Sequence, residues 1–412
     1  MFYGLIGEKL GHSFSREIHA KIASYPYQLV ELTPKELDRF MQRREFTAIN
    51  VTIPYKQAVI PYLDEIDENA RRIGAVNTIV KHIDRLYGYN TDYSGAAALL
   101  RHAGIELQGR HVMILGTGGT SHTLRCVASD LGADRITLVS RHPAEGEIGY
   151  DELPAYSGSV QVLINTTPVG MYPHTDGRPI NLDDFPALEG VADVIYNPLR
   201  TPLIRQAQAR GLKAEGGLYM LAAQAVYASA LFRNIEIAEE VVEKTFLAVL
   251  REKENIVLIG MPSSGKSTVG KELSEKIGRP LLDTDREIVR QCGKTISRIF
   301  AEDGEAFFRE REREVCARLS DRQGIVIATG GGIILNEQNL DALRANGRIY
   351  FLDRPLEQLM ASDDRPLASD RAALEKRYAE RYDRYRAAAD KIIDASGSIR
   401  SNTWQILEDY LQ

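Results

Sequence analysis

The chain is poor in cysteine and tryptophan and has no excess of basic residues. Its 412 residues include three cysteines, one tryptophan, and 51 Lys and Arg against 57 Asp and Glu, for a formal net charge of −6. The cysteines are far apart and form no Cys-x-x-Cys pair, which excludes a disulfide framework and indicates a reducing compartment. The acidic balance argues against a nucleic-acid-binding surface.

A membrane-spanning segment is also missing from the sequence. The most apolar stretch, around residues 218–232, contains Gln224 and Ser229 and is shorter than the ~20 residues that a span needs. Glu8 and Lys9 interrupt the start of the chain before a secretory leader could develop. We therefore expect a cytoplasmic protein with no membrane partner, and the length predicts two to four domains.

Strand-like and helix-like segments alternate throughout, which predicts an α/β protein. The expected strands are residues 2–6, 47–53, 111–115, 135–139, 160–164, 191–195, 256–259, 325–328 and 348–352. Residues 236–251 have helical periodicity and end in a charged run, 251–255. We place a domain boundary at this run.

A complete nucleotide-phosphate loop lies in the middle of the chain, at residues 260–268. Gly260, Gly265, Lys266 and Ser267 fit the G-x-x-x-x-G-K-[ST] pattern, between an apolar strand and a helix-compatible run that starts at Thr268. Backbone N–H groups of such a loop surround phosphate oxygens, Lys266 reaches the β- and γ-phosphates, and Ser267 reaches Mg²⁺. About 250 residues precede the loop, so we expect a second activity there.

The first half contains a second glycine-rich turn, residues 116–120, between a strand and a helix. It is a short relative of the G-x-G-x-x-G turn of dinucleotide-binding folds, although a plain βα turn could look the same. The next strand ends in Ser140 and Arg141, where a cofactor without a 2′-phosphate meets an acidic residue. An arginine there favours NADP(H).

Lys56 and Asp92 are candidates for the chemistry of the first half. Lys56 follows a strand and a proline, and Asp92 lies in the turn Gly88–Asp92. Hydride reduction of a ketone leaves an alkoxide, and a lysine held by a carboxylate can protonate it. The residues alone leave open that Asp92 caps a helix and that Lys56 is a solvated surface charge.

Four features of the second half suggest a phosphoryl-transfer site. Asp283 and Asp285 can hold a metal and orient a hydroxyl, or belong to a plain turn. Arg309 follows two aromatic residues on a charged helix that begins at Gly304, and we expect it to point inward while most charges face solvent. Residues 330–332 are three glycines, which would let the backbone approach a ligand closely or would form a tight turn. Arg381 and Tyr385 share one helix face.

The first half resembles the shikimate dehydrogenase family. The matching segments are residues 11–15, 50–56, 75–78, 90–92, 165–171, 196 with 201–203, and 217–224. The resemblance implies that Lys56 and Asp92 are the catalytic pair. It implies substrate binding by Ser13, Ser15, Thr52, Asn77, Tyr196 and Gln224, and NADP(H) binding by Gly116, Thr117, Gly118, Gly119, Thr120, Ser140, Arg141, Val194 and Gly217. Arg16, Ala20 and His122 depart from the family pattern.

The second half, from about residue 254 to 412, resembles the shikimate kinase family. The resemblance implies catalysis by Lys266, Asp285 and Arg365, and Mg²⁺ binding by Ser267 and Asp283. It implies ATP binding by Gly260, Ser264, Gly265, Lys266, Ser267 and Thr268, and shikimate binding by Asp285, Arg309, Gly331, Gly332 and Arg381. The segment from Leu359 to Arg365 is short, and no proline follows Ala395, so the sequence departs from the family in both places.

The sequence therefore predicts a bifunctional enzyme of chorismate biosynthesis. Residues 1–252 form the dehydrogenase, with a substrate part (1–100 and 218–252) and a Rossmann NADP part (101–217), and residues 254–412 form a P-loop kinase with a parallel sheet. The first would reduce 3-dehydroshikimate with NADPH, and the second would phosphorylate shikimate with Mg-ATP. A quinate dehydrogenase in the first half, or one half acting as a ligand-binding regulator, stays open, as does a monomer or a homodimer.

Overall fold

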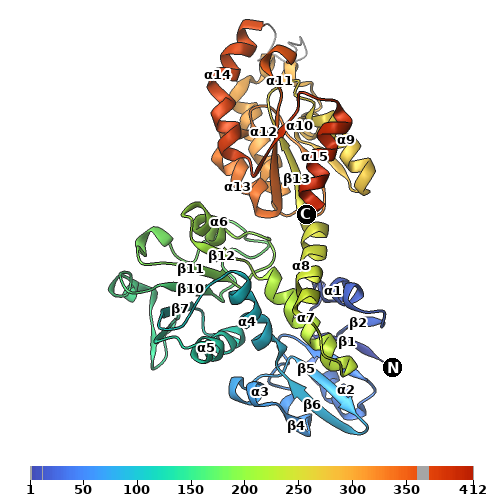
Figure 1. Ribbon diagram of the computed structural model, residues 1–412, viewed down its shortest axis with the longest axis vertical. Helices are drawn as coiled ribbons and strands as arrows, with labels where there is room; N and C mark the ends of the chain where they lie inside the picture. The colour runs from blue at the N-terminus through green and yellow to red at the C-terminus, as the bar shows by residue number, and fades with distance from the viewer. Residues whose placement is uncertain (1, 12, 360–370, 412) are drawn as a thin grey trace. The chain divides into compact units, whose positions relative to one another are not determined.

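The computed structural model describes residues 2–11, 13–359 and 371–411, which divide into two compact units, Met1–Leu250 and Arg251–Gln412. The described residues form three sheets, two in the first unit and one in the second (Figure 1). No helix in the described part of the chain is long and apolar enough to cross a membrane.

The first unit contains twelve of the strands and eight of the α-helices in the described residues. The strands are β1 (Tyr3–Gly7), β2 (Tyr27–Glu31), β3 (Ala48–Val51), β4 (Glu65–Ile66), β5 (Thr78–His82), β6 (Arg85–Tyr89), β7 (His111–Leu115), β8 (Arg135–Val139), β9 (Glu147–Ile148), β10 (Val162–Asn165), β11 (Gly190–Asp193) and β12 (Lys213–Glu215). The helices are α1 (Ser15–Ile22), α2 (Pro34–Arg43), α3 (Glu68–Ile73), α4 (Thr91–His102), α5 (Gly119–Asp130), α6 (Pro202–Ala209), α7 (Leu218–Arg233) and α8 (Glu239–Lys253). Short 3-10 turns are η1 (Ile60–Tyr62), η2 (Tyr150–Ala155) and η3 (Leu182–Asp184).

The two sheets of the first unit differ in strand direction. The first has the order β2-β1-β3-β5-β6-β4 and is mixed, because β5 runs antiparallel to both β3 and β6. The second has the order β12-β11-β10-β7-β8-β9 and is parallel throughout. Counted from β7, that order is 3-2-1-4-5-6, the doubly wound order, whose ligand crevice lies where the winding reverses. The turn after β7 is at this point.

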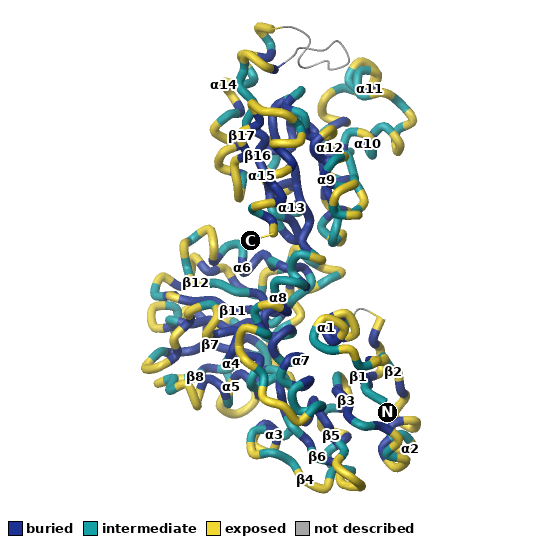
Figure 2. The backbone as a smooth tube through the Cα atoms, turned by 45° about the vertical axis from the view of Figure 1, so that its right-hand side comes forward, coloured by how far each residue is buried: buried dark blue, intermediate teal, exposed yellow. Residues whose placement is uncertain are grey.

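Helices α4 and α7 pack against each other inside the first unit (Figure 1). A Cβ atom on Gly95 of α4 would lie 2.8 Å from the Met220 carbonyl oxygen and 3.0 Å from Gln224 Cβ, so only glycine permits this approach. Helix α7 contributes Ala222 and Val226 to the core beside β7, and Phe232 to the core beside β1. It therefore contributes buried residues, drawn dark blue in Figure 2, to the cores of both sheets.

The second unit has one parallel sheet of order β14-β15-β13-β16-β17. Its strands are β13 (Asn255–Ile259), β14 (Leu281–Asp283), β15 (Val326–Ala328), β16 (Gly347–Asp353) and β17 (Lys391–Asp394). Its helices and 3-10 turns are α9 (Lys266–Ile277), α10 (Thr284–Cys292), α11 (Ile296–Glu302), α12 (Gly304–Leu319), η4 (Ile333–Leu335), α13 (Glu337–Asn346), η5 (Leu356–Gln358), α14 (Arg371–Ala388) and α15 (Ile399–Leu411).

Alternate residues of the central strand β13 enter two separate cores. Val257 and Ile259 pack with helices α10–α14, while Ile256 and Leu258 pack with α9 and α15. A strand buried on both faces reads as a continuous apolar run, which is why the sequence made it easy to find. The loop after β13 then emerges between the neighbouring strands β15 and β16, again where the winding reverses.

All nine expected strands are present, seven of them with shifts of one or two residues at their ends. The sequence analysis missed the short or half-exposed strands β2, β5, β6, β14 and β17, among others. It also placed the start of the phosphate-loop helix at Thr268, whereas α9 begins at Lys266. The charged run 251–255 is not a separate linker, because α8 continues to Lys253 and β13 begins at Asn255. The three cysteines are free thiols.

Candidate active sites

Lys56 and Asp92 form a direct ion pair in the first unit. Lys56 Nζ donates to Asp92 Oδ2 at 2.6 Å, and the two side chains are 25% and 16% exposed. Asn90, rather than Asp92, caps α4, because its side-chain oxygen accepts the Tyr93 N–H at 3.3 Å. The alternative of a capping Asp92 and a solvated Lys56 is therefore wrong.

A buried polar network fixes the position of this pair. Asn77 Oδ1 accepts the Thr91 N–H at 2.7 Å at the start of α4, one residue before Asp92. The Lys56 carbonyl accepts the Val76 N–H at 2.8 Å, one residue before Asn77. Since buried polar groups that are fully hydrogen-bonded hold a unique geometry, Asn77 acts as a brace between the two charged residues.

The other expected substrate residues lie in neighbouring segments. Ser13 Oγ lies 3.0 Å from Ser15 Oγ, and Phe14 between them contacts the ring of Tyr196 at 5.2 Å. Burial raises the pKa of Tyr196, so its hydroxyl stays protonated and can donate. Gln224 faces α4 from α7, and Thr52 follows β3 and lies against Gly7. The structure thus brings Lys56, Asp92 and Asn77 into one network and joins Ser13, Ser15 and Tyr196 through Phe14.

Asp193 organises a loop that the sequence analysis did not assign. Its carboxylate is fully buried and accepts from Thr201 Oγ1 at 2.7 Å, Asn165 Nδ2 at 3.0 Å and the Ile195 N–H at 3.1 Å. Burial raises its pKa to about 7, although these hydrogen bonds oppose the shift. The contacts tie the segment that carries Tyr196 to the end of β10. In the sequence, Asp193 could have been noticed because it is an aspartate at the end of an apolar strand.

The turn after β7 has the shape of an anion-binding site. Gly116 has φ of +100°, which favours glycine, while Cβ atoms on Gly118 and Gly119 would meet nothing within 4 Å. No side chain caps α5, which begins at Gly119, and a helix N-terminus is a place where anions bind well. Thr117 Oγ1 lies 3.5 Å from Ser140 Oγ, and Arg141 is exposed and makes no hydrogen bond or ion pair with any described residue.

Val194 and Gly217 contact each other directly. A Cβ atom on Gly217 would lie 2.0 Å from the Val194 carbonyl oxygen, so the start of α7 could not approach this loop with any other residue. The glycine is therefore explained by packing alone.

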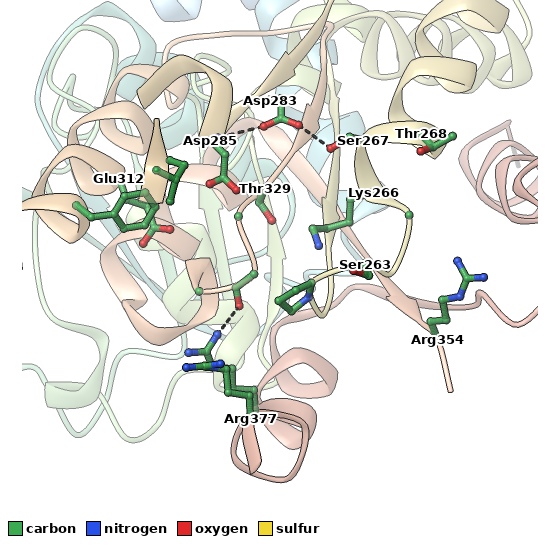
Figure 3. A pocket seen from close by; sticks show the side chains of 18 of the residues that line it. Ser263, Lys266, Ser267, Thr268, Asp283, Asp285, Glu312, Thr329, Arg354 and Arg377 are labelled. Carbon is green, nitrogen blue, oxygen red and sulfur yellow. Dashed lines mark hydrogen bonds between the residues drawn. The ribbon is translucent and has the colours of Figure 1, made fainter. Parts of the chain in front are cut away.

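In the second unit, the phosphate loop opens into a cavity of about 570 Å³ (Figure 3). The expected residues that line it are Gly265, Lys266, Ser267, Thr268, Asp283, Asp285, Arg309, Gly331, Gly332 and Arg381. Gly260 and Ser264 are not among the lining residues, because Ser264 is fully buried and faces Gly260. Arg365 lies outside the described residues.

Asp283 connects the phosphate loop to the next helix. Its Oδ2 accepts from Ser267 Oγ at 2.7 Å, and its Oδ1 caps α10 by accepting the N–H groups of Asp285 and Arg286 (Figure 3). No group of three or more His, Cys, Asp or Glu side chains among the described residues could hold a metal ion. One carboxylate and one hydroxyl suit Mg²⁺, which keeps several waters and binds substrate phosphates as well.

The three glycines 330–332 allow side chains to approach the backbone closely. Cβ atoms would lie 2.5 Å from Asp285 Oδ1 at Gly330 and 2.2 Å from Arg309 Nη1 at Gly332, and none of the three has positive φ. Arg381 Nη1 donates to the Gly331 carbonyl at 3.1 Å. Close approach, rather than a strained turn, therefore explains the run.

Glu312 is a buried charge that the sequence analysis did not single out, whereas the other charged residues of α12 are exposed or half-buried. Its side chain is 1% exposed and accepts from Arg309 Nη1 at 2.9 Å. Burial raises its pKa, and Arg309 opposes the shift. Glu312 lies three positions after Arg309 on the same helix face, but the sequence does not distinguish it from the other charges of α12. Arg354 and Arg377 also line the cavity and were missed.

A doubly wound unit with a Lys–Asp ion pair, followed by a unit with a phosphate loop that opens into a cavity, defines an α/β oxidoreductase joined to a P-loop kinase. Residues 5–79 match the family model described as the shikimate dehydrogenase substrate binding domain, and residues 262–411 match the shikimate kinase model. The chain is 37% identical over 253 residues to a shikimate dehydrogenase (NADP(+)) of Clostridium beijerinckii, covering 57% of this chain and 93% of the relative. A second relative, from Shouchella clausii, is 39% identical over 249 residues, covering 54% and 89%.

Solved structures agree with this assignment. A chorismate mutase/shikimate 5-dehydrogenase fusion protein from Clostridium acetobutylicum is 36% identical with a TM-score of 0.57, covering 60% of this chain and 96% of the other. A shikimate 5-dehydrogenase from Thermus thermophilus, in complex with NADP(H) and shikimate, is 29% identical with a TM-score of 0.54, covering 60% and 98%. The chain belongs to the shikimate dehydrogenase family and carries a C-terminal shikimate kinase domain.

Proposed function

We propose that the first unit reduces 3-dehydroshikimate to shikimate with NADPH and that the second converts shikimate to shikimate 3-phosphate with Mg-ATP. The Lys56–Asp92 ion pair carries the first half of this proposal, because a lysine held by a carboxylate can protonate the alkoxide that a ketone reduction leaves. The cavity between the phosphate loop and Arg309 carries the second half. The names of the relatives, which specify NADP(+), support the cofactor.

In the dehydrogenase, NADPH supplies the hydride. Lys56 donates its proton to the developing alkoxide oxygen, and Asp92 holds the ammonium group in place. A positioned general acid of this kind contributes about 10²–10⁴ in rate. Ser13, Ser15, Thr52, Asn77, Tyr196 and Gln224 bind the carboxylate and hydroxyls of the substrate.

The residues beside β7 and β8 fit NADP(H). In the turn from Gly116 to Thr120, Gly118 and Gly119 leave open backbone for the pyrophosphate, and Ser140 and Arg141 are available to bind a 2′-phosphate. Val194 and Gly217 border the same crevice. We assign residues 101–217 to the cofactor and residues 1–100 with 218–252 to the substrate.

In the kinase, Asp285 accepts the proton of the attacking hydroxyl, and Lys266 stabilises the charge on the transferring phosphoryl group. Ser267 and Asp283 supply oxygen ligands for Mg²⁺. Arg309, Arg381 and the backbone of Gly331 and Gly332 hold the substrate. Arg365, outside the described residues, is proposed to meet the phosphoryl group on the strength of the family resemblance.

A coupled assay tests both activities in one sample. With 3-dehydroshikimate, NADPH and Mg-ATP, loss of NADPH absorbance should precede ADP formation, and omitting NADPH should abolish ADP formation. Loss of NADPH without ADP would make the second unit a ligand-binding regulator. ADP formed from added shikimate without reduction would make the first unit inactive.

Quinate remains a second candidate substrate class for the first unit, because a quinate dehydrogenase from Corynebacterium glutamicum, in complex with NAD, is among the similar structures at 26% identity and a TM-score of 0.53. The paired serines Ser13 and Ser15 favour shikimate. Comparing kcat/KM for 3-dehydroshikimate and 3-dehydroquinate decides between the two.

A further inference from the structure

Arg354 is a cation in the kinase cavity with no assigned role. It follows β16 directly, and its side chain lines the cavity. Its guanidinium makes no hydrogen bond or ion pair with any described residue, although its Nε atom is shielded from solvent and therefore needs a partner. Because a buried, unsatisfied donor is costly, this arrangement indicates a ligand rather than a packing role.

The position of Arg354 identifies which end of a nucleotide it faces. A Cβ atom on Gly265 would lie 3.9 Å from Arg354 Nη1 and 3.5 Å from Ile399 Cδ1, so the guanidinium lies beside the last glycine of the phosphate loop. Asp285 and Glu312, at the other end of the cavity, lie on the opposite side of Lys266 (Figure 3). The phosphoryl group is transferred between Lys266 and Asp285, so Arg354 lies on the nucleoside side.

The chemistry of the neighbourhood favours a phosphate over a neutral group. A phosphate loop binds the α- and β-phosphates through backbone N–H groups at the start of its helix, here α9. Arginine presents a planar fork of donors that matches a phosphate. Ile399, which also lies beside Gly265 and lines the cavity, is apolar and offers the guanidinium no anion.

We propose that Arg354 binds the α-phosphate of ATP and so sets the affinity of the kinase for its nucleotide. The proposal rests on the kinase activity above. It makes Arg354 a substrate-binding residue that acts on ATP and leaves shikimate binding, at the other end of the cavity, unchanged.

The test compares Arg354→Lys, Arg354→Gln and Arg354→Ala in the full chain. Loss of one charge-assisted contact should raise the KM for ATP by about tenfold to a hundredfold in the Gln and Ala variants, and less in the Lys variant, which keeps the charge. The KM for shikimate should stay within about twofold. Arg384→Ala, which removes an exposed arginine of α14, is the matched control and should change neither value.

Binding of Mg-tripolyphosphate, measured by calorimetry with saturating NADP⁺ to fill the dinucleotide site, separates a phosphate contact from a base contact. A phosphate contact predicts that Arg354→Gln weakens tripolyphosphate and ATP by similar factors. Unchanged tripolyphosphate binding with weakened ATP would place the contact on the base or ribose and overturn the proposal. So would a KM for ATP within twofold of the unsubstituted chain.

Two controls keep the outcome clear. Equal KM values for shikimate show that each variant is folded, and Arg354→Lys and Arg354→Gln decide the matter if Arg354→Ala does not fold. If the unsubstituted chain fails to phosphorylate shikimate, the proposed kinase function fails. The tripolyphosphate measurement still decides the role of Arg354.

Discussion

Lys56 in the first unit and Lys266 in the second are both reactive cations, but different kinds of partner hold them. Lys56 donates to the carboxylate of Asp92, an anion that remains beside it through a reduction. Lys266 Nζ donates to the carbonyls of Gly260 and Met261, at 2.8 and 2.9 Å, which are neutral acceptors of its own loop. A bond to a phosphate is charge-assisted and stronger than a bond to a neutral carbonyl, so an arriving phosphate can draw Lys266 Nζ away from these two carbonyls.

The same contrast extends to the neighbouring residues. Asn77 braces Lys56 and Asp92 through backbone contacts that a substrate need not disturb. In the kinase, Ser267 is bonded to Asp283, and Arg381 to the Gly331 carbonyl. The dehydrogenase site is thus preassembled, whereas the kinase site must exchange internal contacts for ligand contacts. The predictions below test this difference, beginning with the largest expected effect.

Lys56→Ala should reduce kcat for ketone reduction by about 10²–10⁴, because the general acid is lost. Kinase turnover on added shikimate should be unchanged, since the chain places Lys56 and the phosphate loop in different units. Both rates are measured on the same preparation. A fall of less than tenfold in reduction would remove Lys56 from the mechanism.

Arg141→Ala should erase a preference for NADPH over NADH of about tenfold to a hundredfold, the effect of one charge-assisted phosphate contact of roughly 1.5–3 kcal/mol. The structure leaves Arg141 exposed without a hydrogen-bonded partner among the described residues, so the substitution breaks no internal contact there. The measurement is kcat/KM for each cofactor. Equal values in the unsubstituted protein would contradict the assignment, and Arg125→Ala on α5 is a suitable control.

The sequence predicted the parts of both sites that depend on local pattern. The phosphate loop, the turn after β7 and the segments around Lys56 and Asp92 are short motifs whose residue types fix their chemistry. Strands buried on both faces, such as β13, were found because they read as apolar runs. Half-exposed strands such as β2 and β6 lack that signal, and tertiary pairing decides them.

Residues that act through long-range contacts could not be found in the same way. Glu312 looks like one charge among many on α12 until the fold buries it beside Arg309. Asp193 acquires its partners Asn165 and Thr201 only when β10 and β11 pair. Arg354 belongs to no motif, and its place beside Gly265 follows from the pairing of β16 with β13.

Asp193 also gives a prediction about pH. Burial raises its pKa to about 7 in the folded protein, above about 3.9 in the unfolded chain. The folded state therefore binds more protons between these values, so this contribution to stability is fully present below about pH 4 and is lost as the pH rises through 7. The slope is at most about 1.4 kcal/mol per pH unit.

Asp193→Asn keeps the hydrogen-bonding shape and removes the titration. Hydrogen exchange of peptides covering β10 and β11, compared between variant and unsubstituted protein at the same pH, isolates the effect. The variant should gain protection relative to the unsubstituted protein as the pH rises from 5 to 8. A constant difference across this range would show that Asp193 does not titrate there.

The smallest expected effect is that of the covalent link between the two units. We expect the link to have no effect on the rate at which shikimate passes from the first site to the second. Each unit contributes the residues of its own site, so shikimate should pass through solvent. Expressed separately, residues 1–250 and 251–412 should each keep their activity. The cut falls before Arg251 because its carbonyl accepts from Arg279 and Tyr410 of the second unit.

When the two separate units are mixed at equal concentration, the lag before ADP appears from 3-dehydroshikimate should equal that of the intact chain. A shorter lag in the intact chain that survives an excess of an inactive kinase unit, added to trap free shikimate, would show direct transfer.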